Sequence, residues 1–241
     1  MNVWKLQNGY TIHSLLNRAA NAYLISAEGT NILVDTGSRK NVDRMIDRIN
    51  RIKEPGRINY MVLTHTHYDH CLNAELLNEI FDPEVIVGES EEEYLYNGFT
   101  PLPDGTRPWS RFIVRIGRSL KESFFSYKGI SSNITVASTY DIPGCAISVI
   151  PTPGHTSGSL SVIVNSEVAV VGDTLFRLFP KTIFPPFADN VPELINSWKI
   201  LLETGCKSFL PAHGREIDTA LLESEYRKYN TTFFTSGTKP D

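Results

Sequence analysis

Three histidines and an aspartate stand within one six-residue segment, residues 65–70, which reads His-Thr-His-Tyr-Asp-His. Imidazole nitrogens and carboxylate oxygens are the donors that divalent transition metals of borderline softness prefer. The segment directly follows an apolar run, residues 60–64, which is typical of a buried strand. Four such donors in one short turn exceed what packing requires, so the segment predicts part of a metal site.

Three further candidate ligands follow apolar runs elsewhere in the chain. His155 and His213 are each expected in a glycine-flanked turn, and Asp173 is expected at the end of the strand-like run 168–171. The chain has six histidines, and five of them occupy such positions. The alternative, that these are unrelated hydrogen-bonded core histidines, is therefore disfavoured.

The number of donors predicts two ions rather than one. Alternate side chains of a strand share a face, so His65 and His67 are expected to point at one ion. The following turn is expected to carry Asp69 and His70 toward a second position. Seven donors are too many for one tetrahedral ion. Cys71 adjoins the cluster, but the harder ligands suffice without it.

Composition limits the classes of partner. The chain has 241 residues, 41% of them hydrophobic and 21% charged, which are near-average values for a globular protein with a large core. A formal net charge of −4 and the lack of a basic stripe argue against nucleic acid as a partner. The basic residues between 111 and 121 are interrupted by apolar ones and predict the solvated face of a helix.

The expected location is the cytoplasm. No apolar run reaches transmembrane length, and the first residues do not resemble a signal peptide, so we expect neither secretion nor membrane binding. Three widely separated cysteines, Cys71, Cys145 and Cys206, indicate free thiols in a reducing compartment. The sequence leaves the oligomeric state open.

The patterns along the chain predict an α/β protein in which helices cover two sheets. Spacing of apolar residues and turn signals favours strands over 23–26, 31–34, 58–64, 85–87, 146–150, 160–164 and 168–171, and helices over 42–49, 74–81, 192–202 and 218–229.

Residues 90–130 depart from this pattern. Their aromatic and proline residues indicate a helical insertion within a single domain spanning 1–241, and Ser90 with Glu93 has the spacing of a capping box. The aromatic segment 94–127 and the irregular segment 176–187 are assigned either to the wall of a substrate cleft or to ordinary loop packing. In the first case the small-molecule substrate has an apolar portion.

Four segments together resemble the metallo-β-lactamase-fold superfamily, and within it the glyoxalase II-like hydrolases. They appear in the order found in that family, are preceded by Asp-Thr-Gly at 35–37, and place the resemblance over roughly residues 20–215. The four segments are His-Thr-His-Tyr-Asp-His at 65–70, Thr-Pro-Gly-His-Thr-Ser-Gly-Ser at 152–159, Gly-Asp-Thr-Leu-Phe at 172–176 and Pro-Ala-His-Gly at 211–214.

The resemblance implies a four-layer αββα sandwich that holds two divalent metal ions, with zinc expected first and iron or manganese as alternatives. A hydroxide shared between the ions would attack a small ester, thioester, lactone or phosphoester. Asp35 would support a ligand histidine from behind, and Asp69 and Asp173 would be the catalytic carboxylates. The implied ligands are His65, His67 and His155 for one ion, Asp69, His70 and His213 for the other, and Asp173 as a bridge.

Departures from the family patterns reduce the range of substrates that the resemblance implies. The best-known zinc β-lactamases resemble this chain less, because they have a cysteine where Asp173 stands. Glyoxalase II proteins continue differently after the Gly-Asp-Thr-Leu-Phe element, so specificity for glutathione thioesters is not expected.

One alternative comes from another class of enzyme. A persulfide dioxygenase-like protein would hold a single iron on His65, His155 and Asp173. An RNA-processing nuclease would share the ligands but would need a basic arm that the sequence lacks, and a non-catalytic metal-binding module would show no turnover.

Overall fold

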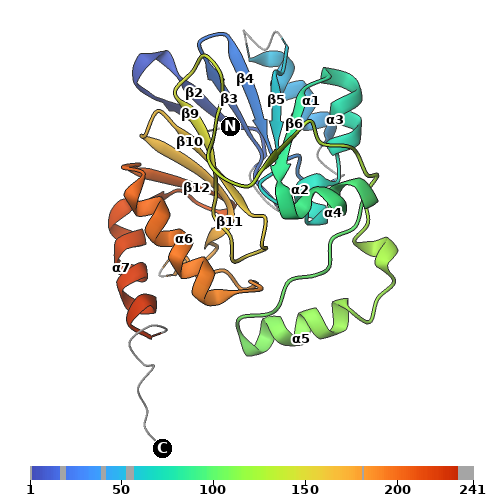
Figure 1. The fold of residues 1–241 in the computed structure, drawn as a ribbon, viewed down its shortest axis with the longest axis vertical. Helices are drawn as coiled ribbons and strands as arrows, with labels where there is room; N and C mark the ends of the chain where they lie inside the picture. Colours follow the sequence, from blue (N-terminus) through green and yellow to red (C-terminus); the bar gives the residue numbers. More distant parts are fainter. Residues whose placement is uncertain (1, 17–19, 39–41, 53–56, 181, 233–241) are drawn as a thin grey trace, which may run out of the picture.

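The computed structural model describes residues 2–16, 20–38, 42–52, 57–180 and 182–232 of the chain. Two β-sheets face each other in these residues, and helices lie on the outer face of each (Figure 1). This arrangement is the expected α/β sandwich, in the layer order helix, sheet, sheet, helix.

The first sheet contains seven strands in the order β1 to β7. Strands β1 to β4 pair antiparallel, whereas β4 to β7 pair parallel, so β4, β5 and β6 all end at the same edge of the sheet. The strands are β1 (Val3–Lys5), β2 (Thr11–Ser14), β3 (Tyr23–Ala27), β4 (Thr30–Val34), β5 (Tyr60–Val62), β6 (Glu84–Gly88) and β7 (Ile134–Val136).

The second sheet contains six strands in the order β13-β12-β11-β10-β9-β8. Its long central strand β11 pairs parallel with β12 and antiparallel with β10. The strands are β8 (Tyr140–Asp141), β9 (Ile147–Pro151), β10 (Leu160–Val164), β11 (Val168–Arg177), β12 (Ser208–Gly214) and β13 (Ile217–Asp218).

Three apolar clusters separate the layers. The cluster between the sheets includes Val62 and Val170, and the cluster outside the first sheet includes Leu77. The cluster outside the second sheet is centred on the fully buried Trp198. The covering helices are α1 (Val42–Arg51), α2 (Tyr68–Cys71), α3 (Ala74–Phe81) and α4 (Glu92–Asn97) on the first sheet and α6 (Val191–Glu203) and α7 (Thr219–Asn230) on the second.

Helix α6 illustrates why the sequence prediction was accurate where local signals are strong. The side chain of Asn190 accepts a hydrogen bond from the backbone N–H of Glu193, and Pro192 lies in the first turn. Trp198 then lies on the buried face and donates a hydrogen bond from Nε1 to the carbonyl of Thr174. The predicted helices at 42–49, 74–81 and 218–229 are also confirmed, as α1, α3 and α7.

Several predicted boundaries near the polar segments are wrong. Strand β5 ends at Val62, so the alternation of a strand cannot explain how His65 and His67 come together. His213 lies inside β12 rather than in a turn, because it pairs with Phe176 of the neighbouring strand. Asp173 lies within β11 and not at its end, because the strand continues through a shift in register.

The predicted capping box at Ser90 and Glu93 is also wrong. Residues Glu89–Glu91 form a 3-10 turn, and α4 begins after it with no side-chain cap. The physical reason is that Glu91 turns inward and is completely buried, so the acidic run is not simply the exposed first turn of a helix.

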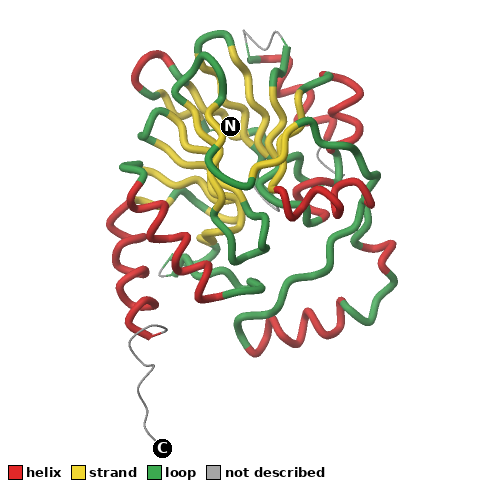
Figure 2. The backbone as a smooth tube through the Cα atoms, viewed as in Figure 1, coloured by secondary structure: helices red, strands yellow, loops and turns green. Residues whose placement is uncertain are grey.

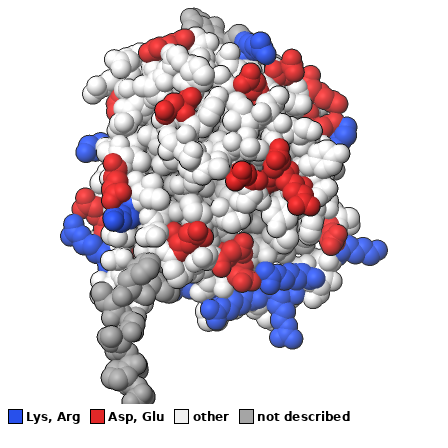
Figure 3. Space-filling view, viewed as in Figure 1, with Lys and Arg blue, Asp and Glu red and all other residues white. Residues whose placement is uncertain are grey.

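The insertion between β6 and β7 carries helix α5 (Pro108–Gly117) away from both sheets (Figures 1 and 2). An isolated bridge between Gly105 and Phe187 ties it to the segment that follows β11. Lys and Arg side chains gather at this edge of the molecule in Figure 3. Across the described ranges, none of the helices is long and apolar enough to cross a membrane.

Candidate metal centre

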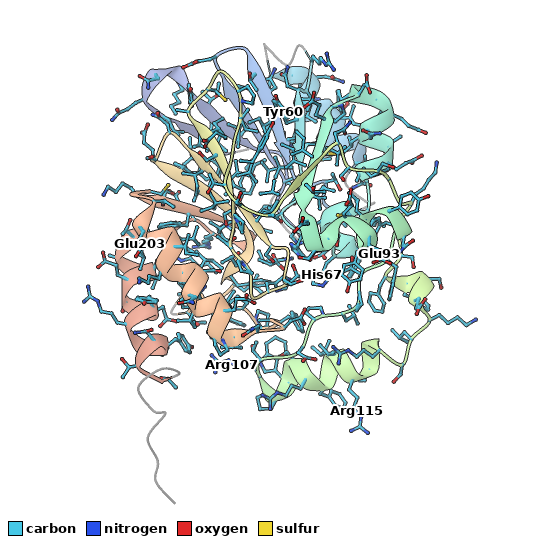
Figure 4. The ribbon with its side chains drawn as sticks, viewed as in Figure 1. Tyr60, His67, Glu93, Arg107, Arg115 and Glu203 are labelled. Carbon is cyan, nitrogen blue, oxygen red and sulfur yellow. The ribbon has the colours of Figure 1, made fainter. Side chains whose placement is uncertain are left out.

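The polar segments that are far apart in the sequence converge at one end of the sandwich. Three overlapping groups of side chains place their ligand atoms within 4.8 Å of one another. In Figure 4 the labelled His67 lies at this end, between the sheets and α5. The groups are His65, His67 and His155; His65, His70 and Asp173; and Asp69, His70 and His213.

Both sheets contribute to this cluster. The loop and short helix α2 that follow β5 carry the four donors of residues 65–70. His155 lies in the loop after β9, and Asp173 and His213 lie on the paired strands β11 and β12. All seven predicted ligands are therefore brought together.

Asp173 lies at the centre of the cluster and faces both groups of histidines. Its Oδ2 atom is 3.5 Å from Nε2 of His155 and 4.0 Å from Nε2 of His65. Its Oδ1 atom is 3.5 Å from Nε2 of both His70 and His213. The two carboxylate oxygens therefore point toward different sets of donors.

These separations fit cation coordination. Metal–nitrogen bonds of about 2.0–2.1 Å in a tetrahedron place neighbouring donors roughly 3.3 Å apart. Nδ1 of His67 is 3.0 Å from Nε2 of His155, and Oδ2 of Asp69 is 3.3 Å from Nε2 of His213. In addition, His65 Nε2, His70 Nε2 and Asp173 Oδ1 are buried without a hydrogen-bond partner. Buried polar atoms are costly unless they are satisfied, and cations would satisfy these.

In each of three histidines, the ring nitrogen remote from the cluster makes a hydrogen bond, which fixes the nitrogen that faces the cluster. Nε2 of His67 lies 3.2 Å from the carbonyl oxygen of Pro101, and Nδ1 of His155 lies 2.9 Å from that of Phe187. A carbonyl can only accept, so these nitrogens carry protons. The opposite nitrogens, His67 Nδ1 and His155 Nε2, are left with free lone pairs.

Asp35 supports the third histidine. Its Oδ2 atom lies 2.9 Å from Nδ1 of His70, so the Nε2 atom of that ring faces Asp173. The same carboxylate accepts hydrogen bonds from the backbone N–H of Thr64 at 2.8 Å and from its hydroxyl at 2.8 Å. Asp35 has φ +60°, a conformation that aspartate tolerates better than most residues. It thus contacts both a candidate ligand and the ligand loop.

Sequence reasoning missed the residues that hold the His65–His67 segment. Glu91 is completely buried and accepts a hydrogen bond from the backbone N–H of Thr66 at 2.9 Å. The Thr66 hydroxyl also donates to this carboxylate, and the Thr100 hydroxyl donates to Thr66. Glu91 follows β6, which runs parallel to β5 and ends at the same edge. That adjacency was the only available signal.

Cys71 also supports the loop and does not join the donors. Its thiol donates to the carbonyl oxygen of His65 at 3.4 Å. Burial raises the pKa of this thiol well above its usual value, which disfavours the thiolate that metals bind.

The electrostatics divide the cluster into two halves. Burial lowers the pKa of His67 and of His155 to about 4, and it lowers the pKa of His65 well below the usual value. These three imidazoles are therefore neutral at pH 7, as a metal ligand must be.

In the other half, carboxylates lie beside histidines and favour their protonated form. Burial opposes the charged form of His70, but the carboxylates of Asp35, Asp173 and Asp69 outweigh it and raise its pKa well above the usual value. Burial likewise opposes the charge of Asp69, yet His70 and His213 lower its pKa. The pKa of His213 is raised, because Asp173 and Asp69 outweigh its burial. A divalent cation would displace these protons.

A cavity of about 410 Å³ opens over the donors. Its base contains Asp69, Asp173 and His213, and the ring of Phe176 stacks on His213 with centroids 4.8 Å apart. Residues of α5 and of the segment after β11 form its walls, as one of the two interpretations of these segments expected. Lys181 of that segment is outside the described residues.

Comparison with known proteins agrees with this arrangement. A curated relative, a probable metallo-hydrolase of Streptococcus pyogenes, is 34% identical over 170 residues, which are 69% of this chain and 67% of that protein. A hydroxyacylglutathione hydrolase of Acidiphilium cryptum is 25% identical over 70% of this chain and 55% of its own length.

The fold is also found among solved structures. A metallo-beta-lactamase from Cronobacter sakazakii, described by its HARLDQ motif, superposes with a TM-score of 0.69 at 15% identity, covering 98% of this chain and 94% of that one. The family model of the metallo-beta-lactamase superfamily matches residues 16–213, which include every donor of the cluster. The chain therefore belongs to the metallo-beta-lactamase superfamily.

Proposed function

We propose that this chain is a hydrolase that works with two divalent cations held side by side. The family and the curated metallo-hydrolase relative support metal-dependent hydrolysis in general. The observation that carries the dinuclear proposal is the orientation of Asp173, whose two oxygens face separate groups of histidines at 3.5–4.0 Å. A single ion would leave one of these groups without a function.

The donor chemistry assigns the ligands. The three neutral histidines would hold one cation, and the group containing Asp69 would hold the other, with Asp173 shared between them. Zinc fits nitrogen-rich donors of this kind, and iron or manganese accepts them as well. When bound, such cations lower the pKa of water and polarise the oxygen of a substrate carbonyl or phosphoryl group.

The residues of the chain position this chemistry. The carbonyls of Pro101 and Phe187 and the carboxylate of Asp35 orient the histidine rings before substrate arrives. Asp69 is the more exposed of the two catalytic carboxylates that we assign, at 25% against 6% for Asp173. Of the two, it is therefore the more accessible to a substrate that enters the cavity.

The substrate classes that suit this site are a small ester, thioester, lactone or phosphoester. The glyoxalase II-like branch is supported by the 25% identity to a hydroxyacylglutathione hydrolase. The segment after Phe176 departs from the pattern expected of that branch, so we do not extend the proposal to glutathione thioesters.

Metal analysis joined to an activity panel tests the proposal. Protein purified without added metal and then dialysed with zinc, iron or manganese should hold two equivalents and hydrolyse a model ester, thioester or phosphodiester. His213→Gln should lower the stoichiometry to one. A single iron with oxygen uptake on a persulfide would instead identify a dioxygenase, and no turnover on any substrate would identify a metal-binding module.

A further inference from the structure

The walls of the cavity over the donors carry information about the substrate. Helix α5 and the loops around it supply one side, and the segment after β11 supplies the other. Trp109 and Phe187 meet across the two sides with ring centroids 6.2 Å apart. The apolar wall residues are Leu102, Pro103, Trp109, Ile113, Val114, Phe125, Phe176, Leu178, Pro186 and Phe187.

The only charged side chains among the described residues lining this cavity belong to the donor cluster. No described lysine or arginine lines it. Two arginines of α5, Arg111 and Arg115, and Arg118 directly after the helix line a different cavity together with Asp104 and Val191. In Figure 4 the labelled Arg115 extends away from His67. An anionic group bound along the walls would therefore be desolvated without a countercharge, which is costly.

The apolar surface continues beyond the cavity. A smaller hollow of about 230 Å³ shares Trp109, Phe176, Leu178 and Pro186 with it. Its lining also includes Arg107, whose guanidinium donates a hydrogen bond to the Tyr229 hydroxyl and lies over the ring of Phe184. Several apolar side chains that line the larger cavity are half exposed, with Trp109 at 50%, Ile113 at 51% and Leu178 at 55%. Apolar side chains gathered around the mouth of a site are typical of a binding groove.

We propose that the site takes an uncharged acyl compound, an ester, thioester or lactone, whose acyl part is a hydrocarbon chain lying between α5 and the segment after β11. This inference rests on the proposed function and narrows it to acyl compounds whose chain along the walls carries no charge. In the reaction, the bond from the acyl carbon to oxygen or sulfur breaks. Water supplies the new oxygen of the acid. One of its protons goes to the alcohol or thiol, which stays attached in the case of a lactone, and the other leaves with ionisation of the acid.

The first test measures binding to the metal-free protein and does not depend on turnover. In this assay, straight-chain alcohols from butanol to decanol compete with the uncharged dye N-phenyl-1-naphthylamine for the apolar groove. Each methylene buried in an apolar groove contributes about 0.8 kcal/mol, which is about a fourfold gain in affinity. We expect this gain to continue until the groove is filled. Affinity that does not change with chain length would overturn the proposal.

Two isoleucines of α5 provide a matched pair of variants. Ile113 lines the cavity. Ile116 lies about one turn further along the same helix, is 49% exposed, and lines none of the three cavities described above. Ile113→Asp should weaken decanol binding at least tenfold, and Ile116→Asp should leave it unchanged. Equal effects of the two variants would refute the assigned position of the chain. Circular dichroism checks that both variants fold.

The second test uses the zinc-loaded protein and a series of thioesters from acetyl to decanoyl. The ratio kcat/KM should rise with chain length in step with alcohol affinity, and an ω-carboxylate on the decanoyl chain should lower it at least tenfold. An equal ratio for the charged and uncharged chains would overturn the proposal. Chain-dependent alcohol binding without hydrolysis of any substrate would refute the proposed function alone, because the groove would still select hydrocarbon.

Discussion

Replacing Asp35 with asparagine tests a residue that orients a candidate metal ligand without being a ligand itself. The Asp35 carboxylate is buried and contacts His70 through Oδ2 at 2.9 Å. Asparagine tolerates φ +60° and keeps the size of the side chain, so the backbone should stay in place. One amide oxygen can still accept the N–H of Thr64. The amide NH2 group, however, cannot accept a hydrogen bond from the Nδ1–H of His70.

The expected magnitude follows from this lost acceptor. With an NH2 group facing Nδ1, the ring of His70 must move its proton to Nε2, the atom that faces Asp173 and Asp69. A protonated nitrogen cannot bind a cation. Losing a partner that orients a ligand histidine costs about 10- to 100-fold in metal affinity, which is about 1.4–2.8 kcal/mol. The loss should fall mainly on the cation held by Asp69, His70 and His213.

Titration against a chromophoric chelator measures the two affinities separately. We expect Asp35→Asn to weaken one site and to leave the site of His65, His67 and His155 nearly intact. Asp47→Asn, an exposed position on α1, is the matched control and should behave like the wild type. Wild-type affinity at both sites in Asp35→Asn, or an equal loss at both, would refute the role assigned to Asp35.

Three other perturbations probe the same end of the sandwich. Glu91→Ala leaves the buried N–H of Thr66 without an acceptor, so we expect a loss of about 1–3 kcal/mol in denaturant unfolding; an unchanged midpoint would contradict this. His67 has a pKa of about 4 when folded and about 6.5 when unfolded, so the unfolded metal-free protein binds more protons between these values and stability falls as pH is lowered. His67→Gln should make that dependence shallower by about one proton, and an equal slope would argue against a neutral buried ring. Gly172→Ala places a Cβ 2.5 Å from the Thr64 hydroxyl at φ +49°, and should lower Tm through a loss of about 1–3 kcal/mol; a wild-type Tm would mean that Thr64 moves freely.

The sequence was sufficient to predict the fold and the gathering of the donors. Apolar runs marked β3 to β6 and β9 to β11, and helix signals such as Pro192 are local, so they survive in the folded chain. The donors were recognised because histidine and aspartate after strands are chemically distinctive. Their convergence then follows from the topology, since β5 and β11 both lead to the same end of the sandwich.

The supports of the site could not be predicted from the sequence. The acceptors behind His67 and His155 are main-chain carbonyls of Pro101 and Phe187, and any residue type supplies a carbonyl. Glu91 looked like an ordinary acidic helix start, because only the tertiary fold turns it inward toward Thr66. The strand boundaries failed where pairing with a neighbouring strand extended β11 and β12 past the expected turns.

The division of the donors between the two sheets has a mechanical consequence. The loop after β5 brings four of them, and the second sheet brings His155, Asp173 and His213. Bound cations would link the two sheets at this end. Each site would add about 4.1 kcal/mol to the free energy of unfolding at a free cation concentration a thousand times Kd. Separation of the two sheets would then begin at the opposite end, near the β3–β4 turn at Glu28 and Gly29, while the sheets stay joined at the metal centre.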